Sequence, residues 1–261
     1  MIKESKLEMN LRVYLARIKK KILSKPFYKD PHFPSYWFLK ALGGREASIV
    51  QIGSNDGKTG DPLNKLFRMN PMWNGLFVEP IPYLFERLKS NYPNQNRFCF
   101  ENVAINEGKK LVFYWVDPEA SKKLETLPYW YDQLGSFDKN HIINELGEKI
   151  IPFILTMDLE GIRLNTLFKR NNIDKIDLLH IDTEGYDWKI LSQLDLDRFK
   201  PKFIMFEANH LNDLELSEVE SFLKGQFSLF KSGIDILAVR IDENENLDIG
   251  EYFSPFSIDH T

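Results

Sequence analysis

Apolar and polar residues follow one another along the chain in a pattern that predicts an α/β fold. The first half contains an apolar strand at 48–53, a helix after Asp61, a strand at 75–79 and a helix at 82–91. Further strands are expected at 97–103, 111–116, 150–156, 176–182, 202–207, 226–231 and 235–241, and further helices at 164–171, 187–199 and 211–223. Such alternation of strands and helices is typical of parallel βαβ units.

Two segments depart from this alternation. Apolar residues at helical spacing among Lys and Arg predict a basic amphipathic helix at 5–24, followed by a Pro-rich linker at 26–34. This helix has two expected uses: docking on its own domain or on a partner subunit in a homodimer, or lying on an anionic membrane surface. Residues 117–149 indicate an insertion or lid over a site. The expected organisation is an arm at 1–45 and one domain at 46–261.

Composition restricts the class of protein further. The chain has 261 residues, 43% of them hydrophobic, which suits a single large core. Its 34 basic and 38 acidic residues give no electrostatic case for nucleic acid as a partner. Cys99 is the only cysteine, so an intramolecular disulfide and a Cys-based zinc site are excluded. With no transmembrane-length apolar run and no signal-peptide pattern, we expect a cytoplasmic protein.

The residues that follow the predicted strands are mostly acidic, and ligands of open α/β sheets bind at such strand ends. The first strand ends in Gly53-Ser54-Asn55-Asp56, which matches neither GxGxxG nor GxxxxGK[ST] and would repel a pyrophosphate. A nucleoside with a positive centre and no phosphate suits this turn, and S-adenosylmethionine is such a ligand. Glu79 ends the second strand, about 20 residues beyond Gly53 and Gly57. A carboxylate there can accept hydrogen bonds from both ribose hydroxyls.

Several motifs then resemble one family, in order and spacing: "QIGSNDG", "LFVEPIPYLFERLKSNYPN", "FENVAINEG", "IDLLHIDTEGYDWKIL" and "PKFIMFEANHL". Together, over about residues 48–241, they resemble the FkbM family of S-adenosylmethionine-dependent methyltransferases. The resemblance implies a Rossmann-like class I methyltransferase fold, with a mostly parallel seven-stranded sheet, a reversed last strand and helices on both faces. It also implies O-methylation of sugars or natural products, and a cofactor site formed by Gly53, Ser54, Asn55, Asp56, Glu79, Asn102 and Asp182.

The chain departs from the family pattern at two positions. His180 stands where family members usually have Lys, and Asn165 where they usually have Asp, so neither is given a family role. Ser136, in "GSFDKNHI", resembles the family's Ser-containing segment and is a candidate site residue.

Methylation of a hydroxyl requires removal of its proton, and an alcohol is a poor nucleophile until this happens. The candidate bases are His210, whose ordinary pKa lies near neutrality, and Asp182, with Glu184 or Glu207 as orienting acids. Structural roles compete with these assignments. Asn55 and Asp56 can close a turn, Asp182 or Glu184 can cap the helix near 187, and His210 can cap a turn. His180 can be a hydrogen-bonded, half-buried residue, and Tyr129, Trp130 and Tyr131 can anchor the insertion or stack on a sugar.

Three functions remain open at this stage. The first is an O-methyltransferase that acts on a hydroxyl of a glycan or a small natural product. The second is a metal-dependent enzyme, because Asp182, Glu207 and His210, with Glu184, offer ligands to Mg²⁺ or Mn²⁺; the ion would assist methyl transfer or define another reaction. The third is a binding module without catalysis, which the clustered carboxylates argue against.

Overall fold

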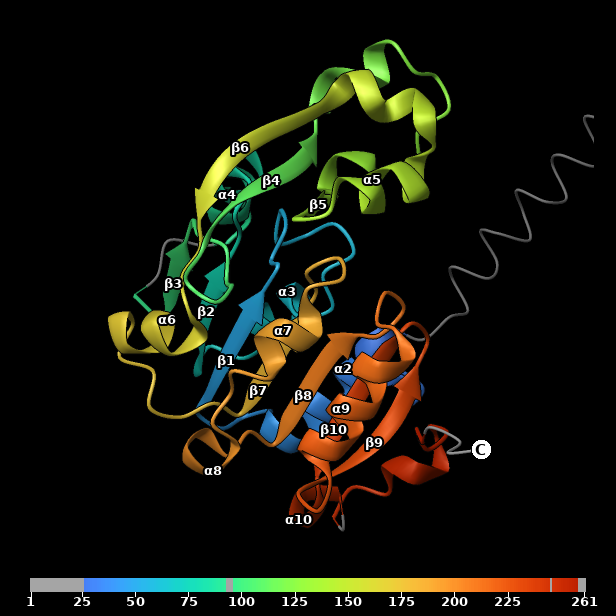
Figure 1. The fold of residues 1–261 in the computed structure, drawn as a ribbon. Helices are drawn as coiled ribbons and strands as arrows, with labels where there is room; N and C mark the ends of the chain where they lie inside the picture. The colour runs from blue at the N-terminus through green and yellow to red at the C-terminus, as the bar shows by residue number, and fades with distance from the viewer. Residues whose placement is uncertain (1–25, 93–95, 245, 258–261) are drawn as a thin grey trace, which may run out of the picture.

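A computed structural model describes residues 26–92, 96–244 and 246–257, and the predicted basic helix at 5–24 lies outside this part of the chain. Its centre is a seven-stranded sheet in the order β3-β2-β1-β7-β8-β10-β9 (Figure 1). The strands are β1 (Ala47–Ile52), β2 (Trp73–Val78), β3 (Phe98–Glu101), β7 (Leu178–Ile181), β8 (Phe203–Glu207), β9 (Phe227–Ser232) and β10 (Asp235–Arg240). All neighbouring strands are parallel except that β10 runs antiparallel to both β8 and β9. The predicted fold class, including the reversed last strand, is confirmed.

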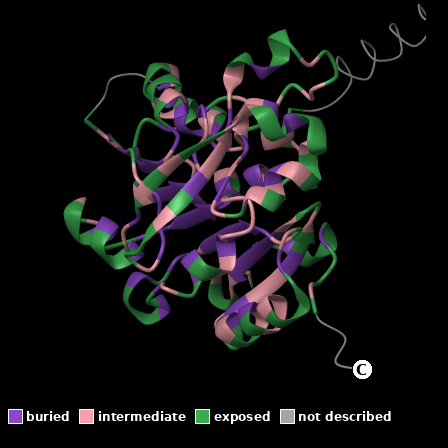
Figure 2. Ribbon diagram, turned by 45° about the horizontal axis from the view of Figure 1, so that its top comes forward, coloured by how far each residue is buried: buried purple, intermediate pink, exposed green. Residues whose placement is uncertain are grey.

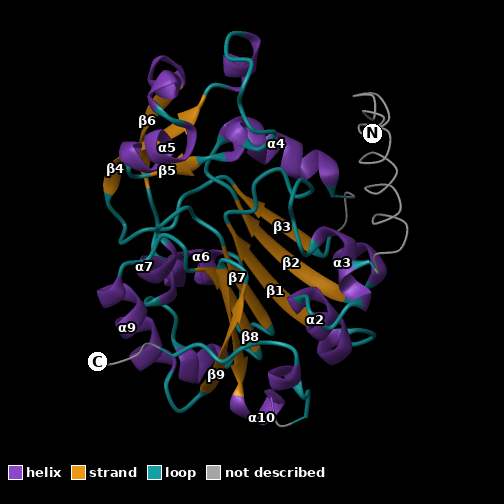
Figure 3. Cartoon of the chain, turned by 90° about the vertical axis from the view of Figure 1, so that its right-hand side faces the viewer, coloured by secondary structure: helices purple, strands orange, loops and turns teal. Residues whose placement is uncertain are grey.

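Both faces of this sheet are covered by helices (Figure 3). One face packs on α6 (Leu164–Arg170), α7 (Asp187–Leu191), α8 (Leu196–Phe199) and α9 (Asp213–Leu223). The other packs on α2 (Pro34–Leu42), α3 (Asn64–Met69) and α4 (Pro82–Asn91). Successive strand residues alternate between the two cores, as Ile49 and Val50 do in β1. Most residues of the central strands are therefore buried (purple in Figure 2) and apolar.

The start of the described chain belongs to this packing. Helix α2 follows a short 3-10 helix at Phe27–Lys29, and its Trp37 and Phe38 are buried in the core on the α3 side of the sheet. This helix falls within the 1–45 span that the sequence assigned to an arm and linker. A last short helix, α10 (Ile241–Asn244), and a 3-10 helix at Ile249–Glu251 complete the described chain.

A second sheet lies beyond the carboxyl ends of the central strands (Figure 1). It has three antiparallel strands, β4 (Lys110–Val116), β5 (Gly135–Ser136) and β6 (Ile154–Glu160), and carries α5 (Lys139–Leu146). Short 3-10 helices at Pro118–Lys122, Tyr131–Gln133 and Glu148–Phe153 connect these elements. The 117–149 insertion has a small core of its own, which includes Tyr131, Leu134 and Ile142.

Two predicted elements were wrong in detail. The strand expected at 150–156 begins only at Ile154, because the chain before it forms the 3-10 helix that contains Pro152. The helix expected at 187–199 is divided into α7 and α8, since the Asp195 side chain accepts a hydrogen bond from the Arg198 N–H and so caps a new helix. Within the described residues, no helix has the length and apolar character needed to cross a membrane.

Candidate active site

The turn after β1 adopts a conformation that only particular residues tolerate. Gly53 has φ 78°, and a Cβ there would lie 1.7 Å from the carbonyl oxygen of Asp182, at the end of β7. Asn55 also has a positive φ, of 54°, in the left-handed region that Asn tolerates better than most residues. The turn therefore brings the ends of β1 and β7 together more closely than a side chain at Gly53 would allow.

Glu79 lies opposite this turn, at the end of β2. Its two carboxylate oxygens accept hydrogen bonds from the backbone N–H groups of Asn55 at 2.9 Å and Ile81 at 2.8 Å. The side chain is buried, and this burial raises the pKa of Glu79 to about 7 despite the two hydrogen bonds. An acid in such a position is held in a fixed place close to the cavity.

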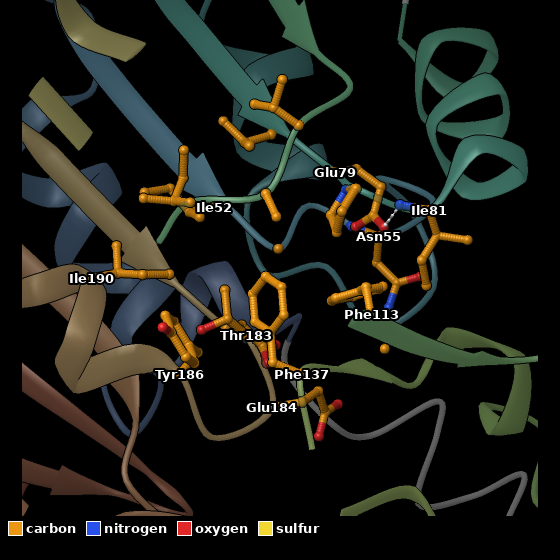
Figure 4. A pocket seen from close by; sticks show the side chains of 18 of the residues that line it. Ile52, Asn55, Glu79, Ile81, Phe113, Phe137, Thr183, Glu184, Tyr186 and Ile190 are labelled. Atoms are coloured by element: carbon orange, nitrogen blue, oxygen red, sulfur yellow. Dashed lines mark hydrogen bonds between the residues drawn. The ribbon is translucent and has the colours of Figure 1, made fainter. Parts of the chain in front are cut away.

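Glu79 and the Gly53 turn form part of a cavity that encloses about 590 Å³ (Figure 4). Its walls are largely apolar and come from strand ends, from the loop after β3 and from the second sheet: Ile52, Val78, Ile81, Val103, Ala104, Ile105, Phe113, Phe137 and Ile190. Figure 4 shows Glu79 on one side of this space and Glu184 and Tyr186 on the other. An apolar slot with a few fixed polar groups is the usual composition of a small-molecule site.

A second, more polar cavity of about 600 Å³ shares Gly53, Asn55, Gln133, Asp182 and Glu184 with the first. Gln51 Oε1 and His180 Nδ1 lie at its wall; both atoms are buried, and neither has a hydrogen-bond partner among the described residues. Burial lowers the pKa of His180 to about 4, so this imidazole is neutral at physiological pH. Buried polar groups without partners are rare in folded proteins, and here they border a space that a polar ligand group can fill.

Asp182 and Glu184 occupy the turn that follows β7. Glu184 has φ 54° and Gly185 has φ 94°, so the turn is left-handed at two consecutive residues. Asp182 is open to the cavity, yet protein surrounds it closely enough that desolvation, with the nearby Glu184 and Asp187 carboxylates, raises its pKa well above the ordinary value. Neither acid caps α7, whose first turn has no side-chain cap. Left-handed backbone at non-glycine residues is costly and is often found at functional sites.

Two histidines meet at Glu184. His141 Nε2, from α5, lies 2.8 Å from Glu184 Oε2, and His210 Nε2, from the loop after β8, lies 3.8 Å from the same oxygen. His210 Nε2 is also 3.3 Å from Glu207 Oε1, and the two imidazoles pack edge to face at 4.4 Å between ring centres. The helix α9 is capped by Asn212 and Glu215, so His210 is not needed as its cap.

The two histidines differ in basicity. Burial and the neighbouring His141 lower the pKa of His210. Burial also disfavours the charged form of His141, but its hydrogen bond and ion pair with Glu184 outweigh this and raise its pKa. The lowered pKa keeps His210 neutral near pH 7, whereas the raised pKa favours the protonated form of His141. Burial, with the charges of Glu184 and Asp187, raises the pKa of Glu207 to about 8.

The insertion reaches the central domain through several polar contacts. Asp132 accepts a hydrogen bond from the Tyr83 hydroxyl through its carbonyl and pairs with Arg87 at 3.0 Å through its side chain. Ser136 Oγ donates to the Glu184 carbonyl at 3.3 Å. With the His141–Glu184 pair, these contacts place the insertion beside both cavities.

The remaining predicted site residues serve the backbone rather than either cavity. Asp56 accepts hydrogen bonds from the Lys58 and Thr59 N–H groups and the Thr59 hydroxyl, so it closes the turn. Ser54 Oγ donates to the Gln51 carbonyl and accepts from the Val78 N–H, although Ser54 also borders the polar cavity. The Asn102 amide donates to the carbonyls of Glu79 and Pro80 at 2.8 and 3.1 Å, which fixes the loop that carries Glu79.

The three neighbouring aromatic residues of the insertion have separate positions. Tyr129 is 80% exposed, whereas Tyr131 is buried and donates a hydrogen bond to the Pro118 carbonyl. Trp130 lines the polar cavity beside His180 and Asp182. Of the two roles considered for these residues, Tyr131 therefore anchors the insertion. Of the three, only Trp130 is placed to contact a ligand. Asn165 is exposed on α6.

Comparison with known proteins identifies the family. The model of the methyltransferase FkbM domain matches residues 51–229, which include both cavities and the insertion. The chain belongs to this family. It is an S-adenosylmethionine-dependent methyltransferase, as the motifs of the sequence predicted. Among curated proteins, no sequence matches the chain significantly.

Several solved structures that resemble this chain in fold are named as methyltransferases. A putative class I S-adenosylmethionine-dependent methyltransferase from Listeria monocytogenes is 12% identical, with 91% of this chain and 69% of that chain covered and a TM-score of 0.40. A TehB-like S-adenosylmethionine-dependent methyltransferase from Corynebacterium glutamicum is 12% identical, with coverages of 89% and 97% and a TM-score of 0.36. A human methyltransferase 10 domain containing protein is 11% identical, with coverages of 83% and 83% and a TM-score of 0.39.

Three polar residues of this FkbM site were not singled out from the sequence. His141 lies within the predicted insertion, and its one available signal was that the chain has only five histidines. Gln133 and Tyr186 were also missed, although both line the first cavity. Each reaches the site through the pairing of β4, β5 and β6 or the turn after β7, and these long-range arrangements leave no local sequence pattern.

Proposed function

We propose that this methyltransferase transfers the methyl group to a hydroxyl oxygen of a glycan or of a small natural product. One observation carries the proposal: a neutral histidine, His210, lies 3.8 Å from Glu184, a residue that lines both cavities and also contacts His141. Methyl transfer to oxygen needs a base, because a neutral alcohol is a weak nucleophile.

The residues present fit S-adenosylmethionine. Glu79 offers a fixed carboxylate for the ribose hydroxyls, and the apolar walls of the first cavity suit an adenine ring. The partnerless Gln51 Oε1 and His180 Nδ1 suit the polar amino-acid end in the second cavity, and the acidic surroundings favour a positive charge. When bound, the cofactor supplies a methyl carbon on a cationic sulfur, which becomes a neutral thioether as the C–S bond breaks and the O–C bond forms.

The protein's own part is to align the acceptor and remove its proton. His210 accepts the hydroxyl proton at Nε2, the Glu184 carboxylate at 3.8 Å stabilises the imidazolium that results and orients both histidines, and Glu207 at 3.3 Å helps to hold the His210 ring. Asp182 lies between the cofactor turn and this cluster and positions the reacting oxygen. The insertion excludes water from the site, and its Trp130 gives a sugar ring an aromatic surface.

We also propose how the chain is organised around this reaction. Residues 46–261, with helix α2 packed on their core, form the catalytic domain, and residues 117–149 are its lid over the acceptor. The single cysteine is consistent with work in a reducing compartment, for which we propose the cytoplasm.

Calorimetric titration of S-adenosylmethionine and S-adenosylhomocysteine tests the cofactor site. Wild-type protein and Glu86→Ala, an exposed position on α4, should bind both with equal affinity. Glu79→Ala should bind at least about tenfold more weakly, because two charge-assisted hydrogen bonds to the ribose are lost. Equal binding by Glu79→Ala would refute the assigned role of Glu79. If S-adenosylmethionine binds, screening of glycan and small-molecule hydroxyls with labelled cofactor tests the acceptor class, and labelling on nitrogen alone would refute O-methylation.

A further inference from the structure

We propose that His141, Glu184 and His210, with Glu207 as a fourth donor, form a binding site for a divalent first-row transition-metal ion. The site is built at the seam between two parts of the chain. His141 comes from α5 in the insertion, Glu184 from the turn after β7, and Glu207 and His210 from the end of β8 and the loop beyond it.

The distances between donor atoms are close to those of a metal site. One nitrogen of each histidine and one oxygen of Glu184 lie within 4.8 Å of one another. Four ligands at about 2.0–2.2 Å in a tetrahedron lie about 3.3–3.6 Å apart. The observed 2.8 Å from His141 to Glu184 and 3.8 Å from His210 to Glu184 bracket this spacing, and the 3.3 Å from His210 to Glu207 matches it. Glu207 lies close to His210 but outside the group of three donors that are all within 4.8 Å of one another, so it is the outer donor of the set.

The charge around these donors also favours a cation. Among the described residues, the ion-pair partners of Glu184 and Glu207 are His141 and His210, and no lysine or arginine pairs with either acid. The Asp187 carboxylate adds negative charge near Glu207. The four side chains are mostly shielded from solvent, with exposed fractions between 8% and 24%. A divalent cation would neutralise two carboxylates that otherwise face each other's charge in a poorly hydrated space.

The donor set selects among cations. Two imidazoles and one or two carboxylates suit Zn²⁺, Fe²⁺, Co²⁺ and Mn²⁺, whereas Mg²⁺ and Ca²⁺ prefer sites made of oxygen alone. The sequence hypothesis of an Mg²⁺ or Mn²⁺ site at Asp182, Glu207 and His210 is thereby changed in two respects. His141 replaces Asp182 among the ligands, and Mg²⁺ is disfavoured.

A consequence for catalysis rests on the proposed O-methylation. An ion at this position lies beside Asp182, where the acceptor hydroxyl would bind. A bound hydroxyl is acidified by a divalent metal ion. His210 would then act as a ligand and not as the base, so the metal-bound and metal-free enzymes would differ in the group that activates the oxygen.

Direct metal binding tests the site without reference to activity. Tag-free protein, stripped with chelator, would be titrated with CoCl₂ while visible absorption is recorded, because the bands of Co²⁺ report its ligands and geometry; ZnCl₂ and MgCl₂ would be titrated by calorimetry. The variants are Glu184→Gln, which keeps the side-chain shape, and His141→Asn. His32→Asn is the matched control, because His32 is exposed and is separated from the proposed ligands by more than 100 residues in the sequence. Circular dichroism and thermal melting would confirm that each variant is folded.

We expect wild type and His32→Asn to bind one Co²⁺ or Zn²⁺ per chain, with Mg²⁺ at least about 100-fold weaker. Glu184→Gln and His141→Asn should each lose at least about tenfold in Co²⁺ affinity. Absence of one-to-one Co²⁺ and Zn²⁺ binding to the wild type would overturn the proposal, as would undiminished binding by both folded variants. Titration of S-adenosylmethionine into the same samples keeps the two proposals separate, since intact cofactor binding without metal binding refutes the metal site alone.

Discussion

Glu79→Gln gives the sharpest test of the physical argument, because Glu79 is buried and its pKa is raised to about 7 from an ordinary value of 4.5. Because its pKa is raised in the folded protein, Glu79 contributes its full stabilisation below pH 4.5, where the folded and the unfolded protein both carry its proton. This stabilisation is lost as pH rises through about 7. Since Gln cannot titrate, the substitution removes this pH dependence and leaves the neighbouring acids unchanged.

The expected magnitude follows from the two pKa values. Between pH 5 and pH 8, Glu79 should reduce the free energy of unfolding of the wild type by about 2.5 kcal/mol. The difference in unfolding free energy between wild type and Glu79→Gln should therefore shift by about this amount across the interval. At pH 8 the variant gains stability from the missing buried charge, but it loses about 1 kcal/mol because one carboxylate oxygen that accepts a backbone N–H becomes an amide group.

Urea denaturation of wild type, Glu79→Gln and the exposed control Glu86→Gln at pH 5 and pH 8 provides the measurement. No cofactor should be present, because its binding would stabilise the wild type selectively. The control should show no such shift. A shift below about 0.5 kcal/mol for Glu79→Gln would refute the reasoning that burial governs this carboxyl group.

Three further substitutions test other parts of the site. Gly53→Ala should destabilise the fold by at least about 3 kcal/mol in thermal or urea melts, because its Cβ meets the Asp182 carbonyl. Gly233→Ala, where φ is also positive but space is open, should cost only about 1 kcal/mol, and equal losses would contradict the close contact. His210→Ala should lower kcat by about 100-fold or more with an unchanged S-adenosylmethionine Kd; a normal kcat in metal-free enzyme would rule out His210 as the base. Trp130→Ala should raise the acceptor KM by up to about tenfold, whereas Tyr129→Ala, being exposed, should leave it unchanged, and parallel effects would exclude stacking at Trp130.

The parts of the fold that sequence could predict are those that local pattern determines. Apolar strands followed by Gly, Asn and acids predicted β1, β2, β7 and β8 and the turns at their ends, and helix α4 begins and ends where expected. The Glu79 cavity was predictable for the same reason. Asp195 divided an expected helix, because one capping side chain changes a boundary that periodicity alone does not detect.

The half of the site contributed by the insertion could not be predicted in this way. β4 and β6 pair across about 40 residues, and nothing in either strand specifies this partner rather than the central sheet. His141 enters the site only as a result of that pairing, through α5. Its meeting with Glu184 also depends on the left-handed turn at Glu184, a conformation for which the residue type gives no signal.

The division of the histidine cluster between scaffold and insertion has a consequence for how such enzymes diversify. Glu184 and His210 belong to the strand ends that every acceptor would face, whereas His141 travels with the segment that shapes acceptor choice. An exchange of this segment between related enzymes would therefore transfer part of the reactive chemistry together with the selectivity. With the roles proposed above, acceptor range and catalytic competence would be coupled, and successful chimaeras would need to preserve a histidine at the position of His141.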